Sequence, residues 1–403
     1  MGLEYTIILC YRLTHATIIT ALYGRSFQTR MNQMKILAID IGTGTQDILL
    51  FDSNQAVENS IQLVMPAPTV IASHRIRAAT TAGNSLVLTG TNMGGGPVTG
   101  AVREHIDAGF PVHATPTAAI TFDDDLDMVL AMGINIVAKD EAARLPGTRV
   151  VLGDLDLSMV RRALEAFEVD PRWDALAVAV FDHGNSPPGY SDRKFRFDHL
   201  RQQVIGSQRE VISFVYLADE VPNYLTRMKA VVDTAGNDTP LLLMDTAEAA
   251  VLGSLEDPHV AAQQCKVVAN LGNEHTLAFH LHDSTILGIF EHHTHLLSQK
   301  RLEEHLQALV HGEIDGDGVW SEHGHGAIVV QGGENIGFLS VIGPMRGILE
   351  GSDLKPYFAT PHGSMMLAGS FGLIRGWAER MPSHRDEILT ALRTVGDGMG
   401  DAH

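Results

Sequence analysis

Short apolar runs separated by glycine, proline and polar turns recur along the chain. The clearest pair lies in residues 35–52, where one apolar run (35–41), a turn of small residues (42–45) and a second apolar run (48–51) follow one another. Two such runs joined by a tight turn predict a β-hairpin. Further strands are expected at 61–68, at 85–90, at 150–157 and from 174 to the Asp182-His183-Gly184 stretch, and helices at 72–82, from Pro97 onward and at 158–168.

The second half of the chain repeats this opening. Residues 266–294 predict a strand, a glycine turn, an alternating strand, a turn and another strand. Residues 240–257 predict a strand followed by a helix of small residues, and residues 334–353 predict a strand, a Gly-Pro turn and a short helix. A longer helix rich in small residues is expected at 361–379.

Length, charge and cysteine content limit the class of protein. The 403 residues suffice for two domains, and 45% hydrophobic with 19% charged residues is typical of a soluble globular protein. The net charge of −19 argues against nucleic acid or membrane surfaces as partners, so a bound phosphate would have to be held by backbone amides and metal. Two cysteines, Cys10 and Cys265, exclude a disulfide framework or a cysteine-built iron–sulfur cluster within one chain and fit a reducing cytoplasm.

Residues 1–33 do not match the pattern that follows. Their apolar stretch is interrupted by Arg12 and His15 and lacks both a basic start and about 18 consecutive apolar residues. We favour a mis-assigned start, with Met34 as the natural first residue, over a signal peptide or an anchor.

The first hairpin turn carries residue types that suit a phosphate. Gly42 and Gly44 lack a Cβ, so the backbone can approach a ligand closely and present its N–H groups. Thr43 and Thr45 add hydroxyl donors, and Asp40 could hold a hydrated magnesium ion. The alternative is an ordinary hairpin that contains a core strand.

These residues resemble the first phosphate loop of the actin, sugar-kinase and molecular-chaperone ATPase superfamily, in which an Asp-x-Gly-Thr/Ser turn joins two strands of an RNase H-like lobe. Other segments resemble further elements of that superfamily in the same order. They are a second phosphate loop (Asn270, Gly272, Asn273, Thr276), a linking helix that begins near Asp245, and an adenosine-contacting turn (Gly343, Arg346). The resemblance covers residues 34 to about 379.

The chain departs from the superfamily pattern at several of these positions. Asn270 replaces the usual magnesium-associated Asp, and one glycine remains in the second loop. Asp245 stands where the linking helix usually has Glu, and we assign it with Asp40 to the metal. Pro344 and Met345 interrupt the adenosine turn, beside which Arg346 could stack on an adenine ring.

The stretch 90–109 has the highest density of glycines in the chain. Its order of strand, glycine-rich loop, proline and helix suits an anion at the helix start, although it lacks the Gly-Lys-Ser/Thr end of a P-loop. The resemblance implies that this region faces the acceptor, so a substrate pocket is assigned to Gly94, Gly95, Gly96 and Thr99. The alternative is that the glycines only permit close packing of strand and helix. Residues 123–125 are expected to cap a helix or form a solvated edge.

The continuous apolar strand that starts at residue 174 ends in Asp182, His183 and Gly184. Because ligands of open α/β sheets bind beyond the carboxyl ends of strands, Asp182 and His183 are candidates for a general base or a metal ligand. The alternative is a turn in which Asp182 caps backbone amides. Arg193 and Arg196 could pair with an anionic substrate or with surface acids.

Histidines are concentrated in one region. Ten of the twenty lie between 275 and 325, namely His275, His280, His282, His292, His293, His295, His305, His311, His323 and His325. Imidazole suits Zn, Fe, Ni or Cu, but no spaced zinc motif is present, so surface or hydrogen-bonded histidines are the favoured interpretation. Strand alternation would place His280 with His282, and His293 with His295, on a common face.

The resemblance implies an α/β protein of two RNase H-like lobes with mixed sheets and a cleft between them. We expect a first lobe at 34–245 with substrate-side insertions, a linking helix at 246–264, a second lobe at 265–380, and a C-terminal helix and tail at 381–403.

The resemblance further implies ATP and Mg²⁺ in that cleft. The first hypothesis is phosphoryl transfer to an unknown small acceptor or to water, with Asp182 or His183 as base. The second is a nucleotide-gated activator of a protein partner, and the third is a histidine-based metalloprotein with a vestigial cleft.

More narrowly, the chain resembles a prokaryotic branch of the superfamily that is sometimes labelled pyruvate formate-lyase activating. A radical S-adenosylmethionine enzyme needs three closely spaced cluster cysteines, and this chain has two distant ones. Radical chemistry of that kind is therefore excluded.

Overall fold

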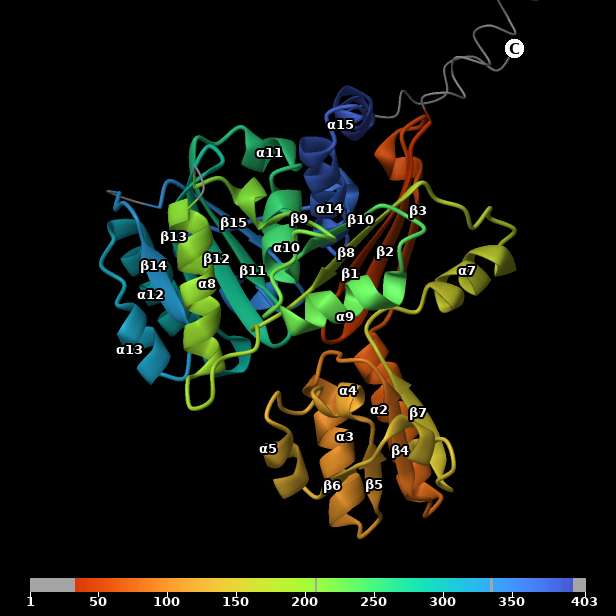
Figure 1. Cartoon of the computed structure of the whole chain (residues 1–403). Coiled ribbons are helices and arrows are strands. Elements are labelled where there is room, and N and C mark those ends of the chain that lie inside the picture. The colour runs from red at the N-terminus through yellow and green to blue at the C-terminus, as the bar shows by residue number, and fades with distance from the viewer. Residues whose placement is uncertain (1–32, 207–208, 334–335, 394–403) are drawn as a thin grey trace, which may run out of the picture.

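The computed structural model describes residues 33–206, 209–333 and 336–393, so the expected leader lies almost entirely outside them. Two six-stranded mixed sheets stand side by side (Figure 1). The first has the order β3-β2-β1-β8-β10-β9. Its strands are β1 (Lys35–Ile41), β2 (Thr45–Asp52), β3 (Ile61–Pro66), β8 (Ala175–Val180), β9 (Tyr216–Leu217) and β10 (Leu241–Met244).

The second sheet repeats the arrangement, with the order β14-β13-β12-β11-β15-β16. Its strands are β11 (Cys265–Leu271), β12 (His275–His282), β13 (Thr285–His293), β14 (Gly326–Val329), β15 (Phe338–Ile342) and β16 (Tyr357–Phe358). Strands β1 and β11 both have seven residues, and β2 and β12 both have eight. In both sheets three antiparallel strands are followed by two that run parallel to the first. This order confirms the expected pair of RNase H-like lobes.

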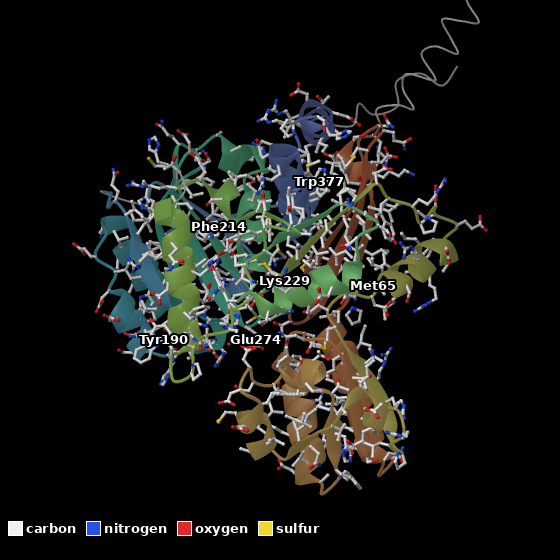
Figure 2. The ribbon with its side chains drawn as sticks, viewed as in Figure 1. Met65, Tyr190, Phe214, Lys229, Glu274 and Trp377 are labelled. Carbon is white, nitrogen blue, oxygen red and sulfur yellow. The ribbon has the colours of Figure 1, made fainter. Side chains whose placement is uncertain are left out.

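A shared apolar core lies between the two sheets. It combines the inner faces of both with α8 (Asp192–Gly206), α10 (Thr246–Ser254) and α14 (Ala368–Arg380). Phe214 and Trp377 belong to this core and lie in the interior in Figure 2. The outer face of the first sheet is covered by α7 (Leu157–Ala166) and α9 (Thr226–Ala235), and that of the second by α12 (Gln299–His311) and α13 (Gly316–Ser321).

A third sheet is inserted after β3. It is parallel, in the order β6-β5-β4-β7, and lies below the first lobe in Figure 1. Its strands are β4 (Leu86–Gly90), β5 (Val112–Ala114), β6 (Ile134–Ile136) and β7 (Thr148–Leu152), and its helices are α2 (Pro68–Thr81), α3 (Gly96–Asp107), α4 (Pro116–Ala119), α5 (Leu126–Ala131) and α6 (Lys139–Ala142). The strand order reverses at β4, because β5 lies on one side and β7 on the other. That reversal creates a crevice at the carboxyl end of β4.

Several elements differ from their expected positions. Helix α14 begins at Ala368, seven residues later than expected, and packs against β1 and β8 of the first sheet although it lies within 265–380. The chain then forms α15 (Arg385–Arg393), and α11 (Pro258–Ala261) precedes β11. Strand β13 ends at His293, so His295 lies in a 3-10 turn and the expected shared face with His293 is wrong. None of the helices in the described part of the chain is long and apolar enough to cross a bilayer.

Helices α10 and α14 cross at two glycines. A Cβ built on Gly253 would lie 1.7 Å from the carbonyl oxygen of Ala368, and one built on Gly372 would lie 1.9 Å from that of Ala249. Since backbone atoms cannot yield as a flexible side chain can, the crossing requires glycine at both positions. The small-residue pattern of the two helices thus reflects direct contact of their backbones.

We predict that Gly372→Ala destabilises the protein by about 1–3 kcal/mol or more, because the added methyl separates the two helices. The helical Gly100→Ala is the matched control, since no heavy atom lies within 4 Å of its added Cβ. Gly100→Ala should leave stability unchanged or raise it by up to about 1 kcal/mol. Urea unfolding of the three proteins measures the difference, and equal midpoints for Gly372→Ala and the wild type would contradict the close crossing.

Candidate functional site

The two hairpin turns face each other across the junction of the lobes. In the first, the amide of Gly42 donates to the carbonyl oxygen of Thr45, and in the second Gly272 donates in the same way to His275, both at 2.9 Å. A Cβ on Gly44 would lie 2.8 Å from Nδ2 of Asn273. Two turns of the same hydrogen-bonded form, one from each lobe, are thus in near contact.

A cavity of about 120 Å³ lies between these turns. The first turns of α10 and α14 also reach its wall, through Thr246, Ala247, Ala368 and Gly369. Helix N-termini present unpaired N–H groups and a partial positive charge, which favours an anion. The remaining wall includes Asp40, Gly42, Thr43, Gly44, Thr45, Asp47, Asn270, Gly272, Asn273, Gly343 and Pro344.

Two carboxylates stand next to each other in this wall. Asp40 and Asp47 are cross-strand partners of β1 and β2, and Oδ1 of each is buried without a hydrogen-bond partner among the described residues. Burial, followed by the charge of Asp47, raises the pKa of Asp40 well above its ordinary value, and burial raises the pKa of Asp47 to about 7. Two like charges this close favour a shared cation, and carboxylate oxygens are the ligands that Mg²⁺ prefers.

The backbone of α14 holds Asp40 in place. A Cβ on Gly369 would lie 1.9 Å from Oδ2 of Asp40, so the carboxylate packs directly against the first turn of the helix. Only glycine leaves room for it there.

A second cavity, of about 400 Å³, adjoins the first. The two share Gly42, Thr43, Phe181, Arg227, Glu274 and His275 as lining residues. Its far wall is the Asn92–Gly96 loop that follows β4, at the strand-order reversal of the inserted sheet. Glu274 accordingly lies between the second lobe and the insert in Figure 2. A cavity of this size at such a crevice fits a small-molecule site.

The second cavity is acidic. Asp123, Asp124 and Asp192 line it together with Glu274. Burial raises the pKa of Asp124 to about 6, and the neighbouring charges of Asp192 and Asp182 add to the rise. A carboxylate whose pKa lies near neutrality is suited to take up a proton.

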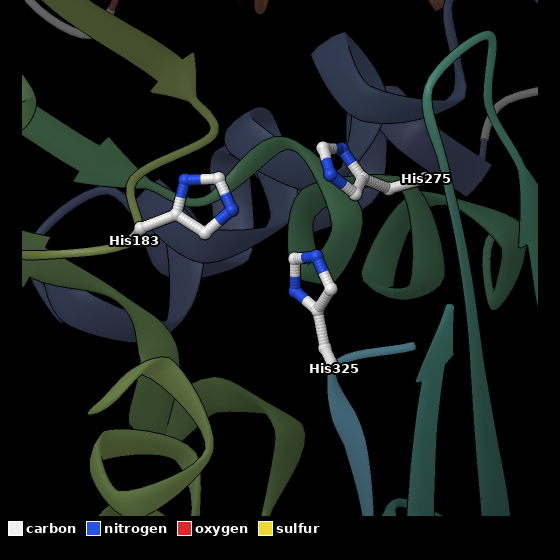
Figure 3. Close-up of side chains that lie close together, drawn as sticks. All are labelled: His183, His275 and His325. Carbon is white, nitrogen blue, oxygen red and sulfur yellow. The ribbon is translucent and has the colours of Figure 1, made fainter. Parts of the chain in front are cut away.

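Three histidines meet beside this cavity. His183 follows β8 in the first lobe, whereas His275 begins β12 and His325 precedes β14 in the second. One nitrogen from each lies within 4.8 Å of the others, and Figure 3 shows the outer nitrogen of each ring directed toward the other two rings. Burial lowers the pKa of all three well below its ordinary value, so they are neutral at neutral pH.

A buried ion-pair network adjoins the histidines. Nδ1 of His325 lies 2.5 Å from Oε1 of Glu291. Both oxygens of Glu291 accept from Nε of Arg196 at 3.0 Å, and Nη1 of Arg196 donates to Asp245 at 2.8 Å. The guanidinium also covers the ring of Phe181, on whose plane His275 stacks at 4.2 Å.

The structure separates the predicted residues into groups. Asp40, Gly42, Thr43, Gly44, Thr45, Asn270, Gly272, Asn273 and Gly343 line the first cavity, while Gly94, Gly95, Gly96, Asp182 and His183 line the second. Thr99, Arg193, Arg196, Asp245, Thr276 and Arg346 line neither.

Four of the six residues that line neither cavity make contacts within the protein instead. Thr276 is buried and hydrogen-bonded to Thr294, and Arg346 reaches the carbonyl oxygen of Gly343. Arg193 donates to the carbonyl oxygens of Trp320 and Gly324. Asp245 caps α10 through the amide of Ala247 and binds Arg196, so its carboxylate is directed at the protein itself.

Arg196, expected to pair with an anionic substrate or with surface acids, pairs with buried acids. Its guanidinium is buried among carboxylates at the lobe junction.

Asp182 is a structural cap. Its Oδ1 accepts from the amide of Gly184 and its Oδ2 from that of Met228 in the first turn of α9, each at 2.9 Å. Burial raises the pKa of Asp182, and the two amide bonds oppose that rise. With both oxygens occupied by backbone, the carboxylate corresponds to the alternative that the sequence left open, and it is not retained as a base.

Several residues at the site were not predicted from the sequence. Asp47 faces Asp40 through strand register, and Asp124 enters the second cavity from a short acidic run. Arg227 reaches both cavities and is held by Asp154 at 2.6 Å and by the carbonyl oxygen of Phe181 at 2.7 Å. The alternation of β2 could have indicated Asp47, whereas Arg227 lies in a helix without a distinguishing motif.

Two facing hairpin turns, two repeated lobes and a cleft between them define an actin-like ATPase fold. The chain belongs to the family described as "Putative pyruvate format-lyase activating enzyme (DUF1786)", whose model matches residues 93–348, more than half of its length. No curated protein matches the chain.

The solved structures to which the chain is similar have low sequence identity and low TM-scores. An ethanolamine utilization protein EutJ from Carboxydothermus hydrogenoformans is 11% identical, with a TM-score of 0.30 over 84% of this chain and 88% of its own. An exopolyphosphatase-like protein is 9% identical, with a TM-score of 0.26 over 77% and 66%. A ROK family transcriptional regulator, a homolog of the E. coli MLC protein, is 8% identical, with a TM-score of 0.22 over 63% and 38%. Because these scores are low, the assignment of the fold rests on the strand order.

We predict that Asp182→Asn lowers stability by about 1–2 kcal/mol, because an amide nitrogen would replace one of the two oxygens that accept from backbone N–H groups. The exposed Asp219→Asn is the control for the loss of a charge. Thermal unfolding measures both variants. An unchanged melting temperature for Asp182→Asn would contradict the capping role.

Proposed function

We propose that the protein binds a nucleoside triphosphate with Mg²⁺ in the first cavity, with the phosphates between the two hairpin turns. The observation that carries this proposal is the meeting of two equivalent turns, one from each lobe, above the N-termini of α10 and α14. Backbone N–H groups would then supply the partial positive charge that binds the phosphates, which the surface of an acidic protein lacks.

The described residues fit a magnesium ion beside the phosphates. Asp40 and Asp47 have unpartnered carboxylate oxygens at the cavity, and Asn270 and Asn273 offer amide groups from the opposite turn. Bound Mg²⁺ would neutralise charge on the transferred phosphoryl group. The protein positions the phosphates, and closure of the lobes excludes water from them.

The second cavity is the proposed site of the small acceptor. It opens directly from the phosphate turns through Gly42 and Thr43. Asp124 replaces Asp182 as the proposed base, because its pKa of about 6 matches proton uptake near neutrality and its carboxylate lines the cavity. The reaction class is phosphoryl transfer to a hydroxyl-bearing acceptor or to water.

A second candidate is a nucleotide-gated activator with little turnover. Where the first hairpin pairs Asp40 with Asp47, the second pairs Asn270 with Leu277. The second lobe therefore brings no carboxylate to a metal at these two positions, which suits binding better than rapid chemistry. The family description refers to activation, and an ATP-driven partner switch agrees with that word.

We predict that Mg-ATP titrated calorimetrically onto the full chain gives saturable heat, and that Asp40→Asn weakens binding about tenfold by removing a metal-facing charge. Asp52→Asn, at the far end of the same hairpin, is the control and should bind like the wild type. The absence of heat with wild-type protein would reject the nucleotide site.

Single-turnover phosphate release distinguishes the phosphoryl-transfer enzyme from the nucleotide-gated activator. We predict release from wild-type protein and a loss of at least roughly tenfold in rate for Asp124→Asn, since a general base contributes about 10²–10⁴-fold. Asp127→Asn, in the neighbouring exposed turn, serves as the control. Saturable Mg-ATP binding without phosphate release from any of the three proteins would favour the activator.

A further inference from the structure

The junction of His183, His275 and His325 has the chemistry of a metal centre. The three ligand atoms lie within 4.8 Å of one another, and a four-coordinate zinc ion with bonds of about 2.0–2.1 Å would place them roughly 3.3 Å apart. Small side-chain rotations toward a common point would close that difference, and the rings already turn their outer nitrogens inward (Figure 3).

Unpartnered nitrogens support this assignment. Nε2 of His275 and Nε2 of His325 are buried without a hydrogen-bond partner among the described residues. Leaving such a group unsatisfied costs about 1–3 kcal/mol, and a metal ion would remove the cost for the inward-facing nitrogens. A packed histidine core would instead be expected to satisfy them with hydroxyls or carbonyls.

Glu291 completes the pattern around the ligands. Its Oε1 lies 2.5 Å from Nδ1 of His325, and its orientation is fixed by the two contacts with Arg196. A carboxylate beside the second nitrogen of a ligating imidazole sets the ring orientation and raises its basicity, as in carboxylate–histidine–zinc arrangements.

We propose that His183, His275 and His325 bind one divalent first-row transition-metal ion, of which zinc is the best match, and that Glu291 positions His325. Three imidazoles leave a fourth position, as catalytic zinc sites do. His183, His275 and the nearby His293 line the second cavity, so the open position would face it and take water or an oxygen or nitrogen atom of the molecule bound there.

The ion would also connect the two lobes. His183 belongs to the first lobe, whereas His275 and His325 belong to the second. His275 is moreover the residue whose carbonyl oxygen closes the second hairpin turn. Metal binding would therefore fix that turn relative to the first lobe, whether or not a nucleotide occupies the first cavity.

A second histidine group is a weaker candidate. His292, His305 and Glu322 also lie within 4.8 Å of one another, but Glu322 is exposed and already paired with Arg301. It serves as the internal comparison for the experiment.

The test is metal binding by the full chain without nucleotide. Purified protein is stripped with a chelator and titrated with Zn²⁺ in competition with a chromogenic chelator, and then with Co²⁺ to record its visible d–d absorption. We expect one tight equivalent of Zn²⁺, and a Co²⁺ spectrum of the intensity typical of four-coordinate sites. The metal should also raise the melting temperature of the wild type, because it binds the folded state.

Variants assign the ligands. His183→Asn and His325→Asn should each lose the tight equivalent and the metal-dependent rise in melting temperature, and Glu291→Gln should weaken Zn²⁺ about 10–100-fold. His282→Asn, an exposed histidine on β12, should bind like the wild type, and His305→Asn tests the second group. His183 lies outside helices and strands, so its variant is expected to fold, and circular dichroism verifies this.

Two results would overturn the proposal. One is the absence of a tight equivalent in the wild type, and the other is retention of that equivalent by a folded His183→Asn, His325→Asn double variant. Either result leaves the Mg-ATP titration unaffected, so failure of the metal site is distinguishable from failure of the nucleotide site.

Discussion

The junction between the lobes depends on one buried cation. The guanidinium of Arg196 is 2% exposed and contacts Asp245 at 2.8 Å, Glu291 at 2.9 Å and Glu248 at 4.0 Å. It also donates to the carbonyl oxygen of Asp182 at the end of the first sheet. Charges removed from water need such partners, and loss of one side of the network would leave the other uncompensated. The start of α10, the end of β8 and strand β13 of the second sheet are thus joined through a single side chain, close to both cavities.

The elements whose structure depends on residues close to one another in the sequence could be predicted. The strand–turn–strand pattern around Gly42 and that around Gly272 depend on neighbours within a few residues, and both turns have the expected form. The glycine-rich loop after β4 likewise follows from its own sequence. The two-lobed fold was inferred from the order of these local elements along the chain.

Roles that depend on distant partners could not be predicted. Arg196 contacts Glu291 across 95 positions, so a residue that the sequence assigned to an anionic substrate or to surface acids lies in the interior. Asp182 has the position in the sequence that is expected of a base at the end of a strand. Its Oδ2, however, accepts a hydrogen bond from the amide of Met228, which lies 46 positions away. The density of histidines indicated residues 275–325, yet the group of three that assembles at the lobe junction includes His183 from outside that range, because three separate elements converge.

The inserted parallel sheet is a unit whose sequence can vary separately from that of the two lobes. The insert begins after β3 and ends before α7, has its own apolar core, and supplies the far wall of the larger cavity. In the part of the chain that the structure describes, the second lobe has no such inserted sheet. Substitutions within this insert can therefore reshape the far wall of the larger cavity, while the two hairpin turns lie in strands outside it.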